Sequence, residues 1–479
     1  MRPALQVPDF LCSAELHFGS SAVGVAVSAL PLRTSETVAC PTRRCHAASP
    51  QDAQQRPNGE RHMIKHSWLL SGLVLAAGMA HAADLPRTAP ASVGMDPDRL
   101  AALTSLLKHD VAEHVLPGAV LTIVRHGKIA YEEAVGSRDP QALGALAARD
   151  DIYRIYSMSK PITVVAALML FEQGRFTLDE PVSKYLPQFK SMQVGVPNDT
   201  GDGMHLVPAD RPMTIQDLMR HSAGLTYGFF GSSPVKTAYL QAHLNADDPD
   251  TATFVDRLAK LPLAYQPGTT WDYSYAIDVL GRLVEVVSGQ TLYDFEKQNI
   301  LDPLDMKDTG FEVEDALRQD RIAEPFADDR VFGIDASFND PRKHSRFQSG
   351  GGGMVSTASD YARFLQMMLN GGILDGHRYL GPQTVRFMTS DQLGSVKPGP
   401  LYLPGPGYHF GLGVAVRVDA GVATFPGSVG DWYWGGAGGT YMWVDPAQDM
   451  VVVFMMQSPR QRLHYRGVIR DLVNAAIIQ

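Results

Sequence analysis

Residues 157–160 read Ser-Met-Ser-Lys, which places a hydroxyl and an amine three residues apart. If they open a helix, that spacing puts Ser157 and Lys160 on one face, a single turn apart. A serine hydroxyl is a poor nucleophile at neutral pH and needs a base within hydrogen-bonding reach. A lysine amine can be that base where burial favours its neutral form. The pair therefore predicts a nucleophile, Ser157, and its base, Lys160.

The Ser-x-x-Lys pattern is weak by itself, because about one is expected by chance in a chain of this length and composition. This chain has three, the others being 105–108 and 233–236. Neither of those precedes a buried helix, whereas Ser157 does. An N-cap serine followed by a solvated lysine is the alternative that the pattern alone leaves open.

The elements that would position this pair follow from hydrophobic spacing. An amphipathic helix is predicted at 96–114 and a β-hairpin at 118–135, turning at His126-Gly127. The nearly continuous apolar run 158–173 is too long for a strand and predicts a buried helix that ends at Gly174. Strand patterns return at 411–417, 439–444 and 450–457, after a middle region of helices and loops.

This order predicts an α/β plus all-α architecture in which both ends of the chain build one sheet. We assign 83–155 plus 346–479 to an α/β sheet domain and 156–345 to an inserted helical domain. Ligand sites commonly form where such domains meet. Ser157 stands at the first crossing between the two.

Two further motifs follow in order along the chain. Residues 267–281 contain Trp-Asp-Tyr273-Ser-Tyr275-Ala-Ile-Asp278, and residues 434–437 read Trp-Gly-Gly-Ala. Together with Ser157-x-x-Lys160 they resemble the motifs of serine β-lactamases and penicillin-binding proteins, and are most similar to those of family VIII carboxylesterases. The resemblance covers nearly all of residues 90–479. It implies the β-lactamase/DD-peptidase-like fold, an antiparallel sheet flanked by helices with an inserted helical domain.

The resemblance also implies roles for individual residues. Tyr273 would act with Lys160 as base and proton shuttle, and the backbone N–H groups of Ser157 and Ala437 would form the oxyanion hole. Glycines after a strand let a backbone approach a substrate closely. The predicted substrate-binding residues are Tyr275, Trp434, Gly435 and Gly436.

Two departures from the β-lactamase pattern favour esters over lactams. Tyr275 stands where β-lactamases usually have an asparagine, and Trp434 replaces a basic residue that attracts the drug's carboxylate. The prediction is a serine carboxylesterase that hydrolyses short- to medium-chain esters through an acyl-enzyme on Ser157, with weak β-lactam hydrolysis at most. The alternatives are a β-lactamase or D-alanyl-D-alanine carboxypeptidase, or a non-catalytic module that binds a lactam or wall fragment.

Three other features have plainer interpretations. Asp278 could orient Lys160 or Tyr273, or could equally cap or solvate a helix. His221 is taken as structural, because no Gly-x-Ser-x-Gly elbow surrounds Ser157. Gly350 to Gly353 is taken as a close-packing turn, because no Gly-Lys-Ser/Thr follows it. Without a ligand cluster such as His-Glu-x-x-His, neither a metal nor a cofactor is predicted.

Composition narrows the partners and the location. With 45% hydrophobic and 19% charged residues and a net charge of −9, the chain has the balance of a globular protein without a basic face for nucleic acid. Residues 63–82 have the parts of a secretory signal ending at Ala82, so 1–62 is interpreted as an upstream extension. All three cysteines lie in that extension. A periplasmic or secreted protein without stable membrane association is expected, acting on a small-molecule ester.

Overall fold

The computed structural model describes residues 84–200, 203–330 and 340–479. These residues belong to one compact unit of the chain. The predicted upstream extension 1–62 and the predicted signal peptide 63–82 lie outside the described residues. None of the described helices is both long and apolar enough to cross a membrane.

The central feature is a seven-stranded sheet in the order β11-β12-β13-β14-β15-β1-β2, in which all neighbours are antiparallel. Its strands are β1 (Gly118–Arg125), β2 (Lys128–Gly136), β11 (Tyr408–Phe410), β12 (Ala415–Arg417), β13 (Trp432–Gly435), β14 (Tyr441–Asp445) and β15 (Met450–Met456). Every residue of β1 and β15 is buried. The sheet is thus assembled from both ends of the chain, as the order of patterns predicts.

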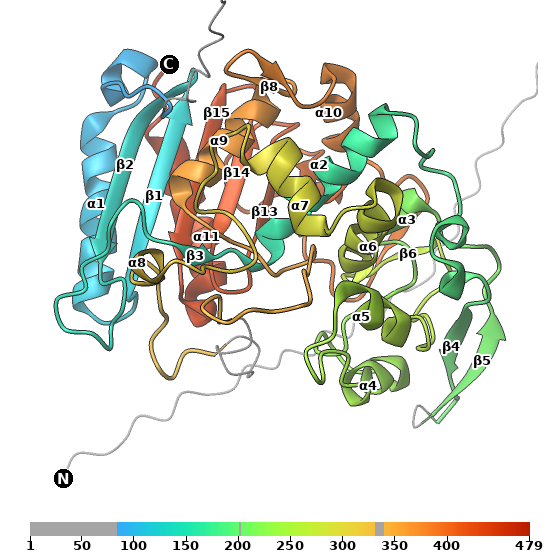
Figure 1. Ribbon diagram of the computed structural model, residues 1–479. Coiled ribbons are helices and arrows are strands. Elements are labelled where there is room, and N and C mark those ends of the chain that lie inside the picture. Colours follow the sequence, from blue (N-terminus) through green and yellow to red (C-terminus); the bar gives the residue numbers. More distant parts are fainter. Residues whose placement is uncertain (1–83, 201–202, 331–339) are drawn as a thin grey trace, which may run out of the picture. The chain divides into compact units, whose positions relative to one another are not determined.

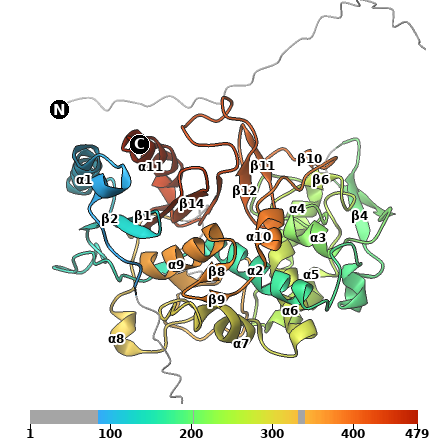
Figure 2. The same ribbon diagram turned by 90° about the horizontal axis from the view of Figure 1, so that it is seen from above.

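Helices cover both faces of this sheet, which explains the continuous burial of its central strands. On one side lie α1 (Pro97–Ala112) and α11 (Arg462–Ala475), which contact each other. On the other side α9 (Ala358–Leu369) contacts β1 and β15, and α2 (Ser159–Glu172) lies beyond it (Figure 2). The layered β-lactamase-like fold that the motifs imply is confirmed.

The middle of the chain supplies helices that gather around α2 and α6 (Figure 1). They are α3 (Ile215–Met219), α4 (Pro234–Gln241), α5 (Thr251–Leu258), α6 (Ala276–Ser288) and α7 (Leu292–Glu296). The short α8 (Ala316–Gln319) lies apart from them, and α10 (Pro382–Met388) comes later in the chain. Short two-stranded pairs accompany them: β3 (Tyr153–Arg154) with β7 (Val355–Ser356), β4 (Gln193–Pro197) with β5 (Met204–Pro208), β6 (Thr270–Trp271) with β10 (Lys397–Pro398), and β8 (Ile373–Leu374) with β9 (His377–Arg378).

The predicted elements agree with the structure where the pattern is long. The β1–β2 hairpin turns at His126 and Gly127, which both take positive φ values of 53° and 70°. Asp96 caps α1 by accepting hydrogen bonds from the amides of Asp98 and Arg99. The strand predicted at 411–417 is shorter, because Gly413 turns the chain with φ 79° before β12 begins. The β4–β5 hairpin was not predicted.

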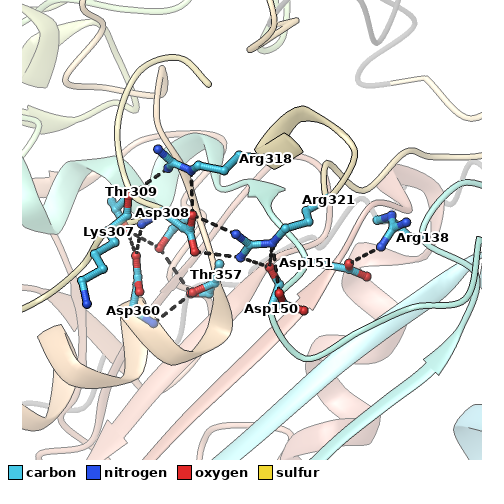
Figure 3. A network of polar contacts seen from close by, with 11 residues as sticks. Arg138, Asp150, Asp151, Lys307, Asp308, Thr309, Arg318, Arg321, Thr357 and Asp360 are labelled. Atoms are coloured by element: carbon cyan, nitrogen blue, oxygen red, sulfur yellow. Dashed lines mark hydrogen bonds and ion pairs between the residues drawn. The ribbon is translucent and has the colours of Figure 1, made fainter. Parts of the chain in front are cut away.

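A network of ion pairs holds the chain segment that leads into Ser157 (Figure 3). Just before β3, the fully buried Asp151 pairs with Arg138, and Asp150 pairs with Arg321. Arg321 also bridges to Asp308, whose backbone amide donates to Asp360 at the start of α9. The segment before Ser157 is therefore anchored to two distant parts of the chain.

Candidate active site

Ser157 lies on a tight turn that opens α2. Residues Tyr156–Met158 form a single 3-10 turn, η2, and Tyr156 takes φ 45°, an uncommon conformation for a bulky residue. Ser159 Oγ ties the turn down by donating to the Tyr156 carbonyl at 2.7 Å and accepting from the Met354 amide at 3.1 Å. Ser157 is partly exposed, whereas the residues around it are buried. The turn thus presents one hydroxyl at the surface of a buried helix.

Lys160 is fully buried and reaches three oxygens. Its Nζ lies 3.3 Å from Ser157 Oγ, 3.2 Å from the Tyr227 hydroxyl and 2.5 Å from the Gly351 carbonyl. The Tyr227 hydroxyl and the Gly351 carbonyl occupy two positions around the amine, and the third is directed at Ser157 Oγ. The arrangement therefore suits a lysine that works as a base.

Tyr273 lies against the same amine. Lys160 Nζ is 4.5 Å from the centre of the Tyr273 ring, and the Trp434 indole N–H donates to the Tyr273 hydroxyl oxygen at 3.2 Å. Trp434, predicted as a substrate-binding residue, is thus also a partner of the predicted proton shuttle.

The glycine turn is held between two helices. A Cβ on Gly350 would lie 2.9 Å from the Thr163 side chain, and one on Gly351 would lie 2.4 Å from Asp278 Oδ2. The prediction of a close-packing turn is confirmed. Asp278 Oδ1 accepts from the Gly351 amide at 3.1 Å and from Ser349 Oγ at 2.5 Å.

Asp278 is therefore neither a helix cap nor a solvated carboxylate. It is 2% exposed and acts on Lys160 through the Gly351 turn, whose carbonyl contacts the amine. Burial raises the pKa of the Asp278 carboxyl, while the charge of Lys160 works in the opposite direction. The sequence left the surroundings of Asp278 open, and the structure places its carboxyl against the glycine turn.

Aromatic rings surround the amine on the side of the helices. The Tyr227 ring makes edge contacts with Tyr273 and Tyr275, at centroid distances of 5.3 and 4.4 Å. Phe229 stacks on Tyr227 at 4.9 Å. We call Tyr227, Phe229, Phe230, Tyr273, Tyr275 and Trp434 the aromatic wall. Tyr275 is partly exposed, as a residue that meets substrate would be.

The turn after β13 approaches the backbone beside Ser157. A Cβ on Gly436 would lie 2.5 Å from the Ile155 carbonyl, and one on Gly435 would lie 2.5 Å from Arg466 of α11. Contacts within the protein thus leave no room for a side chain at these two positions. The sequence prediction gave Gly435 and Gly436 a role in substrate binding and did not include this packing role. Ala437 is partly exposed between buried neighbours, like Ser157.

His221 is buried and contacts the Tyr273 ring at a centroid distance of 4.8 Å. Its Nδ1 lies 3.2 Å from Ser274 Oγ. Burial, and then the charge of Lys160, hold the pKa of His221 well below its usual range. The imidazole is therefore neutral and supports Tyr273 by packing.

Sequence reasoning missed Tyr227 and Arg466, which belong to no motif used in the prediction. Tyr227 could have been suspected from its position, six residues after His221 in a run of aromatic residues. No sequence pattern marks Arg466. Among the described residues, no group of three or more His, Cys, Asp or Glu side chains could hold a metal ion.

Comparisons with known proteins find relatives that match most of the chain. The family model described as Beta-lactamase matches residues 103–474. Protein Rv1367c of Mycobacterium tuberculosis is 36% identical over 354 residues, covering 72% of this chain and 86% of that protein. Esterase EstB of Burkholderia gladioli is 31% identical over 392 residues, covering 76% of this chain and 92% of EstB.

Among solved structures, EstCE1, described as a hydrolase with promiscuous acyltransferase activity, is similar with a TM-score of 0.65 at 27% identity. The match covers 78% of this chain and 98% of EstCE1. The chain belongs to the β-lactamase family. It is a serine hydrolase of that family.

Proposed function

We propose that this protein is a carboxylesterase whose nucleophile is Ser157 and whose substrates are short- to medium-chain esters. The observation that supports this most directly is the 3.3 Å approach of Lys160 Nζ to Ser157 Oγ inside the aromatic wall. An apolar wall suits a neutral ester, whereas an anionic lactam would favour a cation there. The similarity to EstB and EstCE1 supports the same choice.

In the proposed mechanism the lone pair of Lys160 takes the Ser157 proton as Oγ attacks the ester carbonyl. The backbone N–H groups of Ser157 and Ala437 would hold the oxyanion. Tyr273 would pass the proton to the leaving alcohol, and Trp434 would stabilise the phenolate during that transfer by its hydrogen bond. Water then attacks the acyl-enzyme and gives a proton to Lys160, and this proton returns to Ser157 Oγ as the bond to the acyl carbon breaks and the acid leaves.

The test is hydrolysis of p-nitrophenyl butyrate by the wild-type protein and by Ser157→Ala, with a chromogenic cephalosporin as a parallel substrate. Ester turnover that the substitution abolishes, with slow cephalosporin cleavage, supports the proposal. Fast lactam turnover with feeble ester cleavage would make the protein a β-lactamase. Full ester turnover in the variant would overturn the role of Ser157.

Transfer of the acyl group to an alcohol is a second candidate function, favoured by the similarity to EstCE1, a hydrolase with promiscuous acyltransferase activity. An acyl-enzyme between aromatic rings can be attacked by an alcohol that binds there in place of water. Added 1-butanol should then yield butyl butyrate from the p-nitrophenyl ester. If butyric acid is formed and butyl butyrate is not, the protein lacks this transfer activity.

A further inference from the structure

Glu296 is a buried carboxyl that the proposed mechanism does not use. It is the last residue of α7, directly before the single π-turn η5 (Lys297–Leu301), and none of its surface is exposed. Such π-turns occur frequently at functional sites. Its Oε1 lies 2.9 Å from Thr163 Oγ1, and its Oε2 has no hydrogen-bond partner.

Thr163 joins this carboxyl to the active site. It lies one turn after Lys160 on α2, and its Oγ1 is within hydrogen-bonding distance of two oxygens, Glu296 Oε1 at 2.9 Å and the Gly350 carbonyl at 3.2 Å. A threonine hydroxyl has one hydrogen and can donate to only one of them. The protonation of Glu296 decides which oxygen receives it.

If Glu296 carries a proton, the carboxyl donates to Thr163 and Thr163 donates to Gly350, so both hydrogen bonds are made. If Glu296 is ionised, the carboxylate draws the threonine hydrogen, because hydrogen bonds to charged acceptors are the stronger ones. Gly350 then loses this donor. The next carbonyl along, that of Gly351, is the one that contacts Lys160 Nζ.

We propose that protonated Glu296 is a positioning residue that fixes Lys160 through Thr163 and the Gly350–Gly351 turn. The turn is closely packed, because a Cβ on Gly350 would meet the Thr163 side chain and one on Gly351 would meet Asp278. A change at one of these contacts therefore passes to the carbonyl that orients the amine.

The surroundings of Glu296 favour the protonated form near neutral pH. Burial is the largest cause raising the pKa of Glu296 to about 8, with a smaller contribution from the carboxylate of Glu285 on α6, while the hydrogen bond from Thr163 works against it. Glu285 is itself paired with Arg282 at 2.8 Å, and Lys297 of η5 is paired with Asp302.

The test compares the pH dependence of kcat for p-nitrophenyl butyrate in the wild type and in Glu296→Gln. The glutamine amide can donate to Thr163 at every pH. The ratio of variant to wild-type kcat should be near one at pH 6 and rise to ~10 at pH 9, about one unit above the pKa of Glu296, with KM little changed. A ratio that stays constant between pH 6 and 9 would overturn the proposal.

Two further variants separate this relay from a merely structural role. In a Thr163→Val background, Glu296→Gln should no longer change the pH profile, because the link to Gly350 is absent. Glu285→Gln should move the alkaline fall of kcat to lower pH, since a like charge is removed beside an intact Glu296. A persistent effect of Glu296→Gln without Thr163 would contradict the relay.

The inference uses ester turnover as its readout and so rests on the proposed function. Labelling of Ser157 by a fluorophosphonate distinguishes the two failures. Labelling with identical pH profiles for wild type and Glu296→Gln overturns the inference alone. A protein that is neither labelled nor active overturns the proposed function. In that case the protonation of Glu296 is tested by infrared spectroscopy at pH 7. A carbonyl band of a protonated carboxyl that disappears in Glu296→Gln supports the protonated state. The absence of such a band in the wild type overturns the protonated state.

Discussion

The protein buries charge in two regions in opposite ways. Between β12, β13 and α11, the fully buried Asp431 accepts hydrogen bonds from Arg417 at 2.8 Å, Arg470 at 3.0 Å and Tyr408 at 2.8 Å. We call Arg417, Asp431 and Arg470 the ionic cluster. In the active site, Lys160 hydrogen-bonds only neutral oxygens and makes no ion pair with any described residue.

The ionic cluster therefore uses buried charge to stabilise the fold, whereas the active site keeps buried ionisable groups for the proposed catalysis. In the ionic cluster each buried charge has an opposite charge in contact, which offsets much of its desolvation cost. In the active site the buried carboxyls Asp278 and Glu296 have raised pKa values, because burial outweighs the neighbouring groups. Burial raises the pKa of Glu296 to about 8, so this carboxyl can exchange a proton near neutral pH.

The most severe test of the comparison is Lys160→Met, which removes the amine and roughly keeps the volume. Ester turnover should fall by about 10³-fold or more, since the proposed mechanism gives the Ser157 proton to this amine. The free energy of unfolding should fall by no more than about 1–3 kcal/mol, because the Tyr227 hydroxyl and the Gly351 carbonyl lose a hydrogen bond but no ion pair is broken. Urea denaturation and steady-state kinetics measure the two effects, and a variant with most of its activity would contradict this role for Lys160.

The opposite result is expected for Asp431→Asn in the ionic cluster. Two buried guanidinium groups lose their counter-charge, so the free energy of unfolding should fall by roughly 3–5 kcal/mol. Urea denaturation measures the loss. Asp449→Asn is the matched control, because Asp449 is half exposed and pairs with the exposed His126, so a change below about 0.5 kcal/mol is expected.

Asp360 is a buried carboxyl outside both regions, and the pH dependence of stability extends the comparison to it. Burial raises the pKa of Asp360 to about 6. Its protonated form stabilises the fold at low pH, and that contribution is lost as pH rises from about 4 through about 6. Relative to wild type, Asp360→Asn should gain up to about 3 kcal/mol between pH 4 and pH 8. Denaturation across this range measures it, and parallel curves would contradict the raised pKa.

The smallest effect is expected for Trp434→Phe, which keeps an aromatic ring and removes the N–H that donates to Tyr273. Losing one hydrogen bond of about 1–1.5 kcal/mol at the shuttle should lower kcat roughly tenfold. KM should change little if Trp434 acts on Tyr273, and should rise if its main contact is with substrate. Steady-state kinetics on p-nitrophenyl butyrate separates the two.

Hydrophobic periodicity predicted the long elements well, because burial of a strand or helix leaves a regular pattern. The β1–β2 hairpin, α1 and α2 were confirmed, with ends within a few residues. The β4–β5 hairpin was missed because its residues are mostly not buried and so show no apolar alternation. Short strands of two or three residues are determined by their partners, and no local pattern marks them.

By itself, the sequence determined the family, the spacing that puts Lys160 one turn after Ser157, and the motifs that supply Tyr273 and Trp434. Those features depend on local spacing and residue type. Only the tertiary structure decided that Tyr227, Asp278 and Glu296 converge on Lys160, directly or through the glycine turn. These residues lie more than sixty positions from Lys160 along the chain, and their burial and hydrogen bonds exist only once the helices have packed.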